Sequence, residues 1–493
     1  MSAAYPELER RFARIERLRG VAAVLDWDSE TMMPPGGAAA RSEQRATLAL
    51  VCHEMLTDPA LGDLLAGAEA AALEPWQAAN LAAMGRDRRL ATAVAPALVE
   101  AFEKATADAA LVWRGARRDD DFAALAPALE RVVALAREVG AARAEALGCT
   151  PYEALLDGFE PGARETEIDA LFAEVEAFLP ALLDRVLGRQ GPPPRRPEGP
   201  FPIARQAALA RRLMAVVGFD FAHGRLDVSE HPFCGGVPGD VRVTTRYDEA
   251  DFTRSLMGVL HETGHAIYEN GLPEAWRHQP VGRAASMALH ESQSLLVEMQ
   301  ACRSRAFLAF AAPMMRAAFD GSGPAWEAAN LHRLYTRVAR GPIRVDADEV
   351  TYPLHVIVRY RLEKALIGGT LAVADLPGAW REAMRERLGI AVESDREGCL
   401  QDIHWAEGLF GYFPTYTLGA LAAAQFFAAA RASVDGLVGA IGEGDFAPLM
   451  GWLGAKVHAL AASLPPGEIV RRATGAPLGV AAFRAHLERR YLA

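Results

Sequence analysis

Lysine is nearly absent from this chain of 493 residues, which has 52 lysines and arginines in total. Only Lys104, Lys364 and Lys456 are lysines, and the other 49 cations are arginines. An excess of positive charge is also lacking, because 63 acidic residues bring the net charge to −11. A negatively charged chain repels the phosphates of nucleic acids and anionic membranes. We therefore exclude nucleic acid and membrane as its main partners.

Cysteine is scarce, and no two cysteines form a Cys-X-X-Cys pair. The five are Cys52, Cys149, Cys234, Cys302 and Cys399. An odd, scattered set favours a reducing compartment over a disulfide framework. The first twenty residues interleave charges where a signal peptide needs an apolar run, so we expect a cytoplasmic protein. The longest uncharged stretch, between Glu407 and Arg431, contains proline, glycines and polar side chains, which argues against a membrane span.

The residue pattern favours a mainly α-helical fold. Alanine, leucine, glutamate and arginine dominate, and apolar residues recur at steps of three and four, as at Leu129, Val132 and Ala136. Strand signals are few. The clearest lie within 225–247, where glycines and prolines flank short β-branched runs and predict a small sheet or hairpin.

One segment, 188–202, interrupts the helical pattern. Six prolines within 192–202 exclude a helix there and leave an extended loop. Such a loop is compatible with a linker between domains and equally with a surface loop of one large fold. We find no internal repeat, and we predict a single domain over 1–493 with a Pro-rich surface loop at 188–202.

A metal-binding motif, HETGH, begins at His261. Two histidines four residues apart on a helix differ by about 40° around its axis, so His261 and His265 leave the same face and can converge on one cation. Glu262, beside the first histidine, can then hold a water molecule that the metal activates. The simpler alternative is a core or solvated histidine pair on an ordinary helix.

Helix start and stop signals surround this motif. Acidic residues at 248–251 predict the beginning of a helix, and Asn270-Gly271 predicts its end. Apolar residues at helical spacing lie between these signals. The motif is therefore expected in the second half of an amphipathic helix.

A catalytic zinc also needs a third protein ligand and an open position for water. The run HESQSLLVE follows, and Glu291, with 25 residues between it and His265, opens a second helical pattern. A helix crossing the first could bring Glu291 to the two histidines and complete a His₂Glu set. Glu298 and Glu269 are rivals, although such acids are more often solvated or support a ligand. His290 is expected to point elsewhere, because adjacent helical residues diverge by about 100°.

With these residues identified, the sequence resembles the carboxypeptidase Taq family of zinc-dependent metallocarboxypeptidases over most of its length. The motifs that carry the resemblance are LDWDSETMMPPGG at 25–37, PYEALLDGFEPG at 151–162, HPF at 231–233, DVRVT at 240–244, HETGH at 261–265, HES at 290–292, IRVDAD at 343–348, GCLQDIHW at 398–405 and GYFPTYTLG at 411–419. So many spaced motifs are far more specific than the zinc signature alone. The Pro-rich loop at 188–202 is the part we cannot match to the family.

The resemblance implies a large helical metallopeptidase fold with a deep active-site groove, a homodimer and one divalent metal per chain, zinc first and cobalt second. It also implies stepwise release of single amino acids from peptides with a free C-terminus. Carried over by motif, the metal ligands are His261, His265 and Glu291, and the catalytic glutamate is Glu262.

Two further roles are assigned by motif. We expect His404 and Tyr412 to donate hydrogen bonds to the developing oxyanion. The alternatives are a buried histidine satisfied by Asp402 and a tyrosine in the core. Cys399 lies near these residues in the sequence, but no histidine is placed to activate it, which argues against a thiol nucleophile.

An exopeptidase must also recognise the terminal carboxylate of its substrate. Arg344 and Arg242 are the candidates, since the planar guanidinium pairs with a carboxylate through two hydrogen bonds. The alternatives are ordinary salt bridges, of Arg242 to Asp240 and of Arg344 to Asp346 or Asp348.

Two other functions stay open. A zinc oligopeptidase would cut internal bonds of short peptides and would lack an arginine closing the cleft near the metal. A helical scaffold or peptide-binding module would keep zinc for stability only. Glu262 argues against the scaffold, because a structural site normally has four protein ligands and needs no base.

Overall fold

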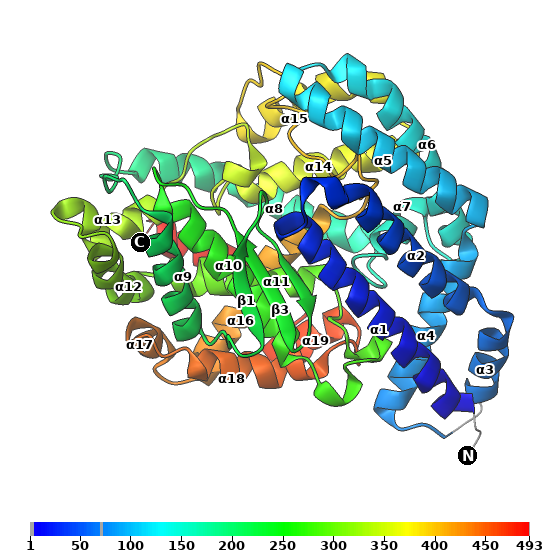
Figure 1. Ribbon diagram of the computed structural model, residues 1–493. Helices are drawn as coiled ribbons and strands as arrows, with labels where there is room; N and C mark the ends of the chain where they lie inside the picture. The colour runs from blue at the N-terminus through cyan, green and yellow to red at the C-terminus, as the bar shows by residue number, and fades with distance from the viewer. Residues whose placement is uncertain (1–3, 70–71, 493) are drawn as a thin grey trace. The chain divides into compact units, whose positions relative to one another are not determined.

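Helices make up most of the computed structural model, which describes residues 4–69 and 72–492 (Figure 1). The helices are α1 Ala4–Thr31, α2 Ala38–Thr57, α3 Pro59–Glu69, α4 Pro75–Ala93, α5 Pro96–Asp119, α6 Phe122–Leu147, α7 Pro151–Leu156, α8 Glu165–Arg189, α9 Ile203–Val217, α10 Phe252–Gly271, α11 Met287–Leu295, α12 Arg305–Ala318, α13 Ala328–Tyr335, α14 Tyr352–Gly368, α15 Leu376–Leu388, α16 Pro414–Ser433, α17 Leu437–Gly442, α18 Ala447–Lys456, α19 Pro466–Thr474 and α20 Ala481–Leu492. The predicted mainly α fold is confirmed. Among the described residues, we find no helix with the length and apolar character needed to cross a bilayer.

The chain divides into two compact units, each assembled from separate stretches of sequence. Unit 1 comprises Met1–Ala91, Pro192–Tyr335 and Ala422–Leu478, and unit 2 comprises Thr92–Gly191, Thr336–Leu421 and Gly479–Ala493. The chain passes from unit 2 to unit 1 between Gly191 and Pro192, inside the Pro-rich segment. This segment contains no helix from 190 to 202. Helix α8 runs through Arg189, so the non-helical segment begins two residues later than predicted. The single domain over 1–493 stays a prediction.

A three-stranded sheet in unit 1 confirms the strands predicted within 225–247. Its strands are β1 Gly224–Val228, β2 Cys234–Val237 and β3 Asp240–Thr245, in the order β1-β3-β2. Strand β3 pairs in parallel with β1 and antiparallel with β2. Val241 and Val243 alternate inward and pack with Val259 and Ala266 of α10 in one buried cluster. The sheet thus lies beside the helix that carries HETGH (Figure 1).

Helix α10, Phe252–Gly271, matches the helix predicted around that motif. It begins where the Asp251 carboxylate accepts a hydrogen bond from the Thr253 amide at 2.9 Å, an N-cap that satisfies one free backbone donor. It ends at Gly271, close to the predicted stop. The apolar positions Leu256 and Leu260 are buried, so packing and capping act together to fix this helix.

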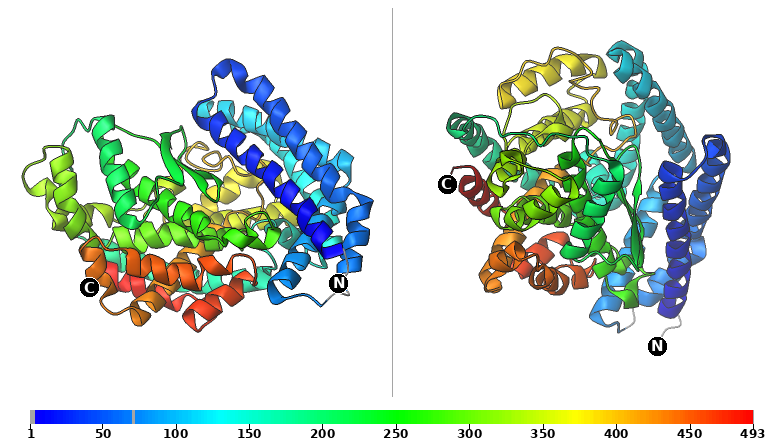
Figure 2. Two further views of the ribbon diagram at one scale, coloured as in Figure 1. Left: turned by 60° about the horizontal axis from the view of Figure 1, so that its bottom comes forward. Right: turned by 60° about the vertical axis from the view of Figure 1, so that its left-hand side comes forward.

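Helices α1 and α2 run side by side in unit 1 (Figure 2). Helix α1 also packs against β2, where a methyl group of Val237 lies close to Gly20. Arg283 ties α1 to the segment before α11 through ion pairs with Glu16 of α1 and, at 2.8 Å, Asp87 of α4. Because the Arg283 side chain meets two carboxylates, the position of α1 beside this segment is well fixed.

Candidate functional site

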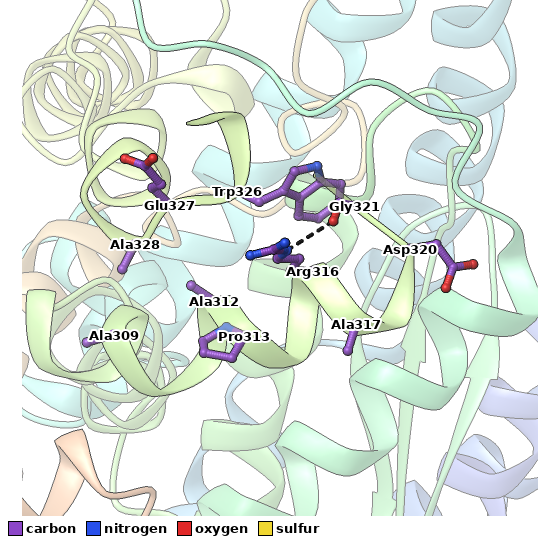
Figure 3. Close-up of a pocket in the computed structure, with 10 residues that line it drawn as sticks. All are labelled: Ala309, Ala312, Pro313, Arg316, Ala317, Asp320, Gly321, Trp326, Glu327 and Ala328. Carbon is purple, nitrogen blue, oxygen red and sulfur yellow. Dashed lines mark hydrogen bonds between the residues drawn. The ribbon is translucent and has the colours of Figure 1, made fainter. Parts of the chain in front are cut away.

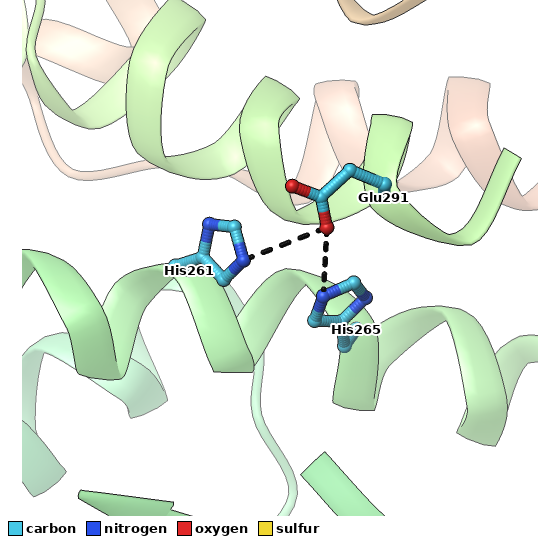
Figure 4. A group of neighbouring side chains, drawn as sticks. All are labelled: His261, His265 and Glu291. Carbon is cyan, nitrogen blue, oxygen red and sulfur yellow. Dashed lines mark ion pairs between the residues drawn. The ribbon is translucent and has the colours of Figure 1, made fainter. Parts of the chain in front are cut away.

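His261, His265 and Glu291 meet in unit 1, with their ligand atoms all within 4.8 Å of one another (Figure 4). Oε2 of Glu291 lies 3.7 Å from Nε2 of His261 and 3.3 Å from Nε2 of His265. All three side chains are largely shielded from solvent. The structure therefore brings together the three residues predicted as metal ligands.

These separations suit a small divalent ion. Ligand atoms about 2.0–2.2 Å from a tetrahedral zinc lie about 3.3–3.6 Å from each other. Two imidazole nitrogens and one carboxylate oxygen are also the donors of known three-ligand catalytic zinc sites. The site can hold one divalent metal, and three protein ligands leave room for a fourth, exchangeable one.

A glycine inside the motif lets the second helix come close. A Cβ atom placed on Gly264 would lie 2.5 Å from the Gln293 carbonyl oxygen and 2.6 Å from Cα of Ser294, so any side chain would push α10 and α11 apart. Helix α11 begins at Met287, where Ser286 is the N-cap. We predicted that Glu291 opens the second helix, and this is wrong, because Glu291 lies in the second turn of that helix.

His261 is held from behind by a carboxylate. Its Nδ1 lies 3.0 Å from Oε2 of Glu298, whose Oε1 accepts from Arg303 at 2.5 Å. An Nδ1–H bond to a carboxylate leaves the Nε2 lone pair of His261 facing the metal position. Glu298 lies in a π-helical segment, Leu296–Cys302, a conformation frequent at functional sites.

His265 is held by a second histidine instead. Nδ1 of His290 lies 2.6 Å from Nδ1 of His265, and Nε2 of His290 lies 2.8 Å from Oε1 of Glu269. The carboxylate of Glu269 accepts a hydrogen bond from Nε2–H of His290, so Nδ1 of His290 carries a lone pair that accepts a hydrogen bond from Nδ1–H of His265. The Nε2 lone pair of His265 is then free for a metal.

Glu298 and His290 thus contact the two histidines of HETGH directly, and Glu269 does so through His290. Glu298 lies on Nδ1 of His261 and Glu269 lies on Nε2 of His290, outside the group formed by His261, His265 and Glu291. The expectation that His290 points elsewhere is wrong, because the close approach of α11 to α10 turns its ring onto His265. Sequence reasoning also missed Arg303 and Ser294, whose hydroxyl lies 3.2 Å from Oε2 of Glu291. Both contacts are local, since Ser294 is three residues from Glu291 and Arg303 is five residues from Glu298, so helical spacing was the signal that could have found them.

Glu262 is buried beside the same group, with 8% of its surface exposed. Burial raises the pKa of its carboxyl to about 7, and the neighbouring ring of His261 opposes the shift. A carboxyl with that pKa can both accept and release a proton near neutral pH. Its position next to the ligand histidines suits the base predicted there.

Unit 2 contains Arg344, which is 5% exposed. Its Nε and Nη2 donate to Oδ1 of Asp402 at 3.0 and 2.8 Å, so the predicted partners Asp346 and Asp348 are wrong for its salt bridge. Arg359, fully buried, meets the other oxygen of Asp402 at 2.6 Å. Two guanidinium groups on one carboxylate leave this cluster one positive charge in excess.

His404 and Tyr412 lie beside one another in the same unit, with ring centroids 5.7 Å apart. Nε2 of His404 is 3.3 Å from the Tyr416 hydroxyl, while its Nδ1 has no hydrogen bond. The alternative that Asp402 satisfies this histidine through a hydrogen bond is therefore wrong. Burial lowers the pKa of His404 to about 4, so its ring is neutral at pH 7.

Arg242, on β3 in unit 1, forms the salt bridge considered for it. Its Nη2 lies 2.8 Å from Asp240, and its guanidinium lies 4.2 Å from the centre of the Trp27 ring. Asp240 neutralises this arginine. The charge balance therefore favours Arg344 over Arg242 for a further carboxylate.

A separate hollow of about 610 Å³ lies on α12 and the segment before α13, far along the chain from HETGH (Figure 3). Among the described residues that line it are Arg316, Asp320 and Glu327, but no histidine or cysteine. Nε of Arg316 donates to the Gly321 carbonyl at 3.0 Å. The residues that line this hollow therefore lack the imidazole donors of the His261, His265 and Glu291 group.

Fold and site together define the class: a helical protein in which an HExxH helix and a second helix bring together three side chains that could hold a metal ion. Comparison with known proteins specifies the family. The profile of the carboxypeptidase Taq (M32) metallopeptidases matches residues 7–491. The chain belongs to this family of metallocarboxypeptidases, which are peptide hydrolases, and it therefore has a divalent metal as cofactor.

Individual relatives agree with the family match. Thermostable carboxypeptidase 1 of Thermus thermophilus is 40% identical over 508 residues, which cover 99% of this chain and 97% of the relative. Carboxypeptidase 1 of Bacillus subtilis is 33% identical, and the match covers 97% of this chain and 96% of the relative. The solved structure of metallocarboxypeptidase 1 from Trypanosoma cruzi matches all of both chains with a TM-score of 0.97 and 43% identity.

Proposed function

We propose that His261, His265 and Glu291 bind one zinc ion and that Glu262 acts as general base and acid in removing single C-terminal residues from peptides. The observation that supports it is the convergence of the three ligand atoms within 4.8 Å beside a buried glutamate. When bound, zinc polarises a carbonyl and lowers the pKa of water to about 7.

The chain's own residues then move the proton. Glu262 accepts a proton from the attacking water and delivers it to the leaving amine. Neutral His404 and the hydroxyl of Tyr412 are proposed to donate to the developing oxyanion, as their motifs suggest. Glu298 and His290 keep the ligand histidines in the tautomer that offers Nε2.

Arg344 is proposed to bind the substrate's terminal carboxylate, with Arg242 as the second candidate. The excess positive charge of the Arg344, Arg359 and Asp402 cluster supports this role. A carboxylate would neutralise that charge, and a buried pair of this kind is strongly favoured over an unpaired cation.

Replacing Arg344 by alanine is expected to raise KM by about tenfold or more, with metal content unchanged. Asp402 keeps Arg359 as its partner, so no buried carboxylate is left unpaired and the fold should persist. The measurement is steady-state hydrolysis of a free-ended peptide. Arg340→Ala, which removes a more exposed pair with Asp184, is the control. Equal losses on free and C-terminally amidated peptides would count against the clamp.

Glu298→Ala is expected to weaken zinc binding about 10- to 100-fold, because His261 loses the partner that orients it. Competition with a chromophoric chelator measures the affinity directly. Glu298→Gln retains an acceptor for Nδ1–H and should lie between alanine and the unmodified protein. Unchanged affinity in both variants would assign Glu298 a role in packing only.

Mass spectrometry of a free-ended peptide after incubation, combined with metal analysis, tests the function as a whole. Sequential loss of single C-terminal residues supports it. Internal fragments would favour the zinc oligopeptidase, and one tightly held zinc without any cleavage would favour the scaffold.

Three finer properties are also part of the proposal: zinc in preference to cobalt, a homodimer and a cytoplasmic location. The family resemblance supports the first two, and five free cysteines support a reducing compartment. Metal analysis of protein from its own cells, sedimentation equilibrium and cell fractionation test them in turn.

A further inference from the structure

Glu363, an acid on α14 in unit 2, has a side chain that is fully buried. Within residues 4–69 and 72–492, none of its hydrogen-bond partners is a basic side chain. Burying a carboxyl group without a cation costs free energy, which hydrogen bonds offset. Burial accordingly raises its pKa to about 8, and the hydrogen bonds that it accepts limit this shift. The position of this acid therefore depends on its hydrogen bonds, and each of them holds another segment of the chain.

Three segments of unit 2 donate to this one carboxyl group. The Tyr152 hydroxyl of α7 donates to Oε1 at 2.5 Å, and the backbone amide of Gly411 donates to the same oxygen at 3.3 Å. Nε1–H of Trp405 donates to Oε2 at 3.1 Å. Tyr152 and Trp405 are buried as well, so these bonds lie in surroundings of low dielectric constant, where they are strengthened.

Two of these donors are the immediate neighbours of the proposed oxyanion donors. Trp405 follows His404, and Gly411 precedes Tyr412. From 404 to 413 the chain forms turns, without helix or strand. The spacing between the two side chains therefore depends on what holds this segment, and Glu363 binds it close to each of its ends.

Packing fixes the second end of the segment as well. Gly411 has a φ of +89°, and a Cβ atom on it would lie 2.7 Å from Cα of Leu156 in α7. Only glycine fits at this close approach. Next to it, the ring of Tyr412 packs edge-on against Phe159, with ring centroids 5.0 Å apart. Together with the hydrogen bond to Glu363, these contacts leave Tyr412 little freedom to move.

We propose that Glu363 is a positioning residue that fixes the spacing between His404 and Tyr412, so that both side chains can donate to one oxyanion. Its buried carboxyl group does not touch the substrate and acts only through the indole and the backbone amide that it holds. A donor displaced by about 1 Å loses much of its effect on the transition state. This inference rests on the proposed function and extends it from the two donors to the group that orients them.

Glu363→Leu removes both acceptor oxygens and keeps a side chain of similar length. It is expected to lower kcat for a free-ended peptide about 10- to 100-fold, with KM changed less than about twofold and metal content unchanged. Glutamine can accept from Trp405 and donate to the Tyr152 oxygen, but it then has no acceptor for the Gly411 amide. The kcat of Glu363→Gln should therefore lie between those of the leucine variant and the unmodified protein.

Tyr152→Phe is the matched control, because it removes a donor from the same buried group and leaves the bonds to Trp405 and Gly411 in place. It should lower Tm, as the Glu363 variants do, but keep kcat unchanged. In a Tyr412→Phe background, which lacks the positioned hydroxyl, Glu363→Gln should lower kcat by a clearly smaller factor than in the unmodified protein.

Two results would overturn the inference: a fall in Tm with kcat unchanged in the Glu363 variants, or factors in kcat that multiply fully with Tyr412→Phe. If the leucine variant does not fold, the glutamine variant decides by the same criteria. Full kcat in both His404→Gln and Tyr412→Phe, or no release of a terminal residue, would refute the proposed function instead. Hydrogen exchange of the amides in 404–412 then still decides the inference. Exchange should be faster in Glu363→Gln but not in Tyr152→Phe, and equal exchange in both variants would overturn it.

Discussion

Glu262→Gln is expected to lower kcat about 10³- to 10⁴-fold while the protein keeps one metal ion per chain. Glutamine has nearly the shape of glutamate but cannot accept a proton, so the change removes the general base without opening a cavity. Because no metal ligand is altered, the affinity for metal should stay the same. Single-turnover and steady-state hydrolysis of a free-ended peptide, with metal measured on the same sample, separate the two properties.

The control for this change is Glu274→Gln, an exposed glutamate just after α10. It should leave both kcat and metal content unchanged. Activity retained by metal-replete Glu262→Gln protein would remove Glu262 from the mechanism. A parallel loss of metal would show that the glutamate supports the site structurally.

Glu291→Ala is expected to reduce bound zinc to background and activity by at least about 10³-fold. Two histidines alone are a weak site, and the only carboxylate oxygen among the three ligand atoms comes from Glu291. The unmodified protein should lose activity in a strong chelator and regain it when zinc is returned. Its Tm should also fall when the metal is removed, since a ligand that binds only the folded state stabilises it by RT ln(1 + [L]/Kd).

Metal analysis and thermal denaturation with and without zinc check this second prediction. The Tm of Glu291→Ala should no longer depend on zinc, whereas Glu249→Ala, an exposed glutamate before α10, should behave as the unmodified protein. A variant that still holds one zinc per chain would show that another side chain supplies the third ligand.

Several local features were predictable because neighbouring residues decide them. The N-cap at Asp251, the apolar spacing and the stop at Gly271 define α10 with no help from the rest of the chain. The alternating residues of β3 likewise follow from its own pattern. The prediction that Glu291 opens α11 is wrong, because the N-cap of this helix is Ser286, which precedes the HES motif.

Contacts between distant residues were not predictable in the same way. The partner of Arg344 is Asp402, 58 residues away, and not the two acids within four residues of it. With 63 acidic residues in the chain, sequence proximity is a poor guide to a buried ion pair. The direction of the His290 ring was also not predictable from sequence proximity, since it depends on how closely α11 approaches Gly264.

The sequence by itself determined the helix that carries HETGH, the paired histidines on one face of it, and the family whose motifs recur along the chain. Each of these depends on spacing within a short segment, which chain geometry alone fixes. Only the tertiary structure decided which residues contact the histidines of HETGH and which carboxylate Arg344 meets. Those relations depend on packing between segments far apart in the sequence, where side-chain volume and buried charge select the partners.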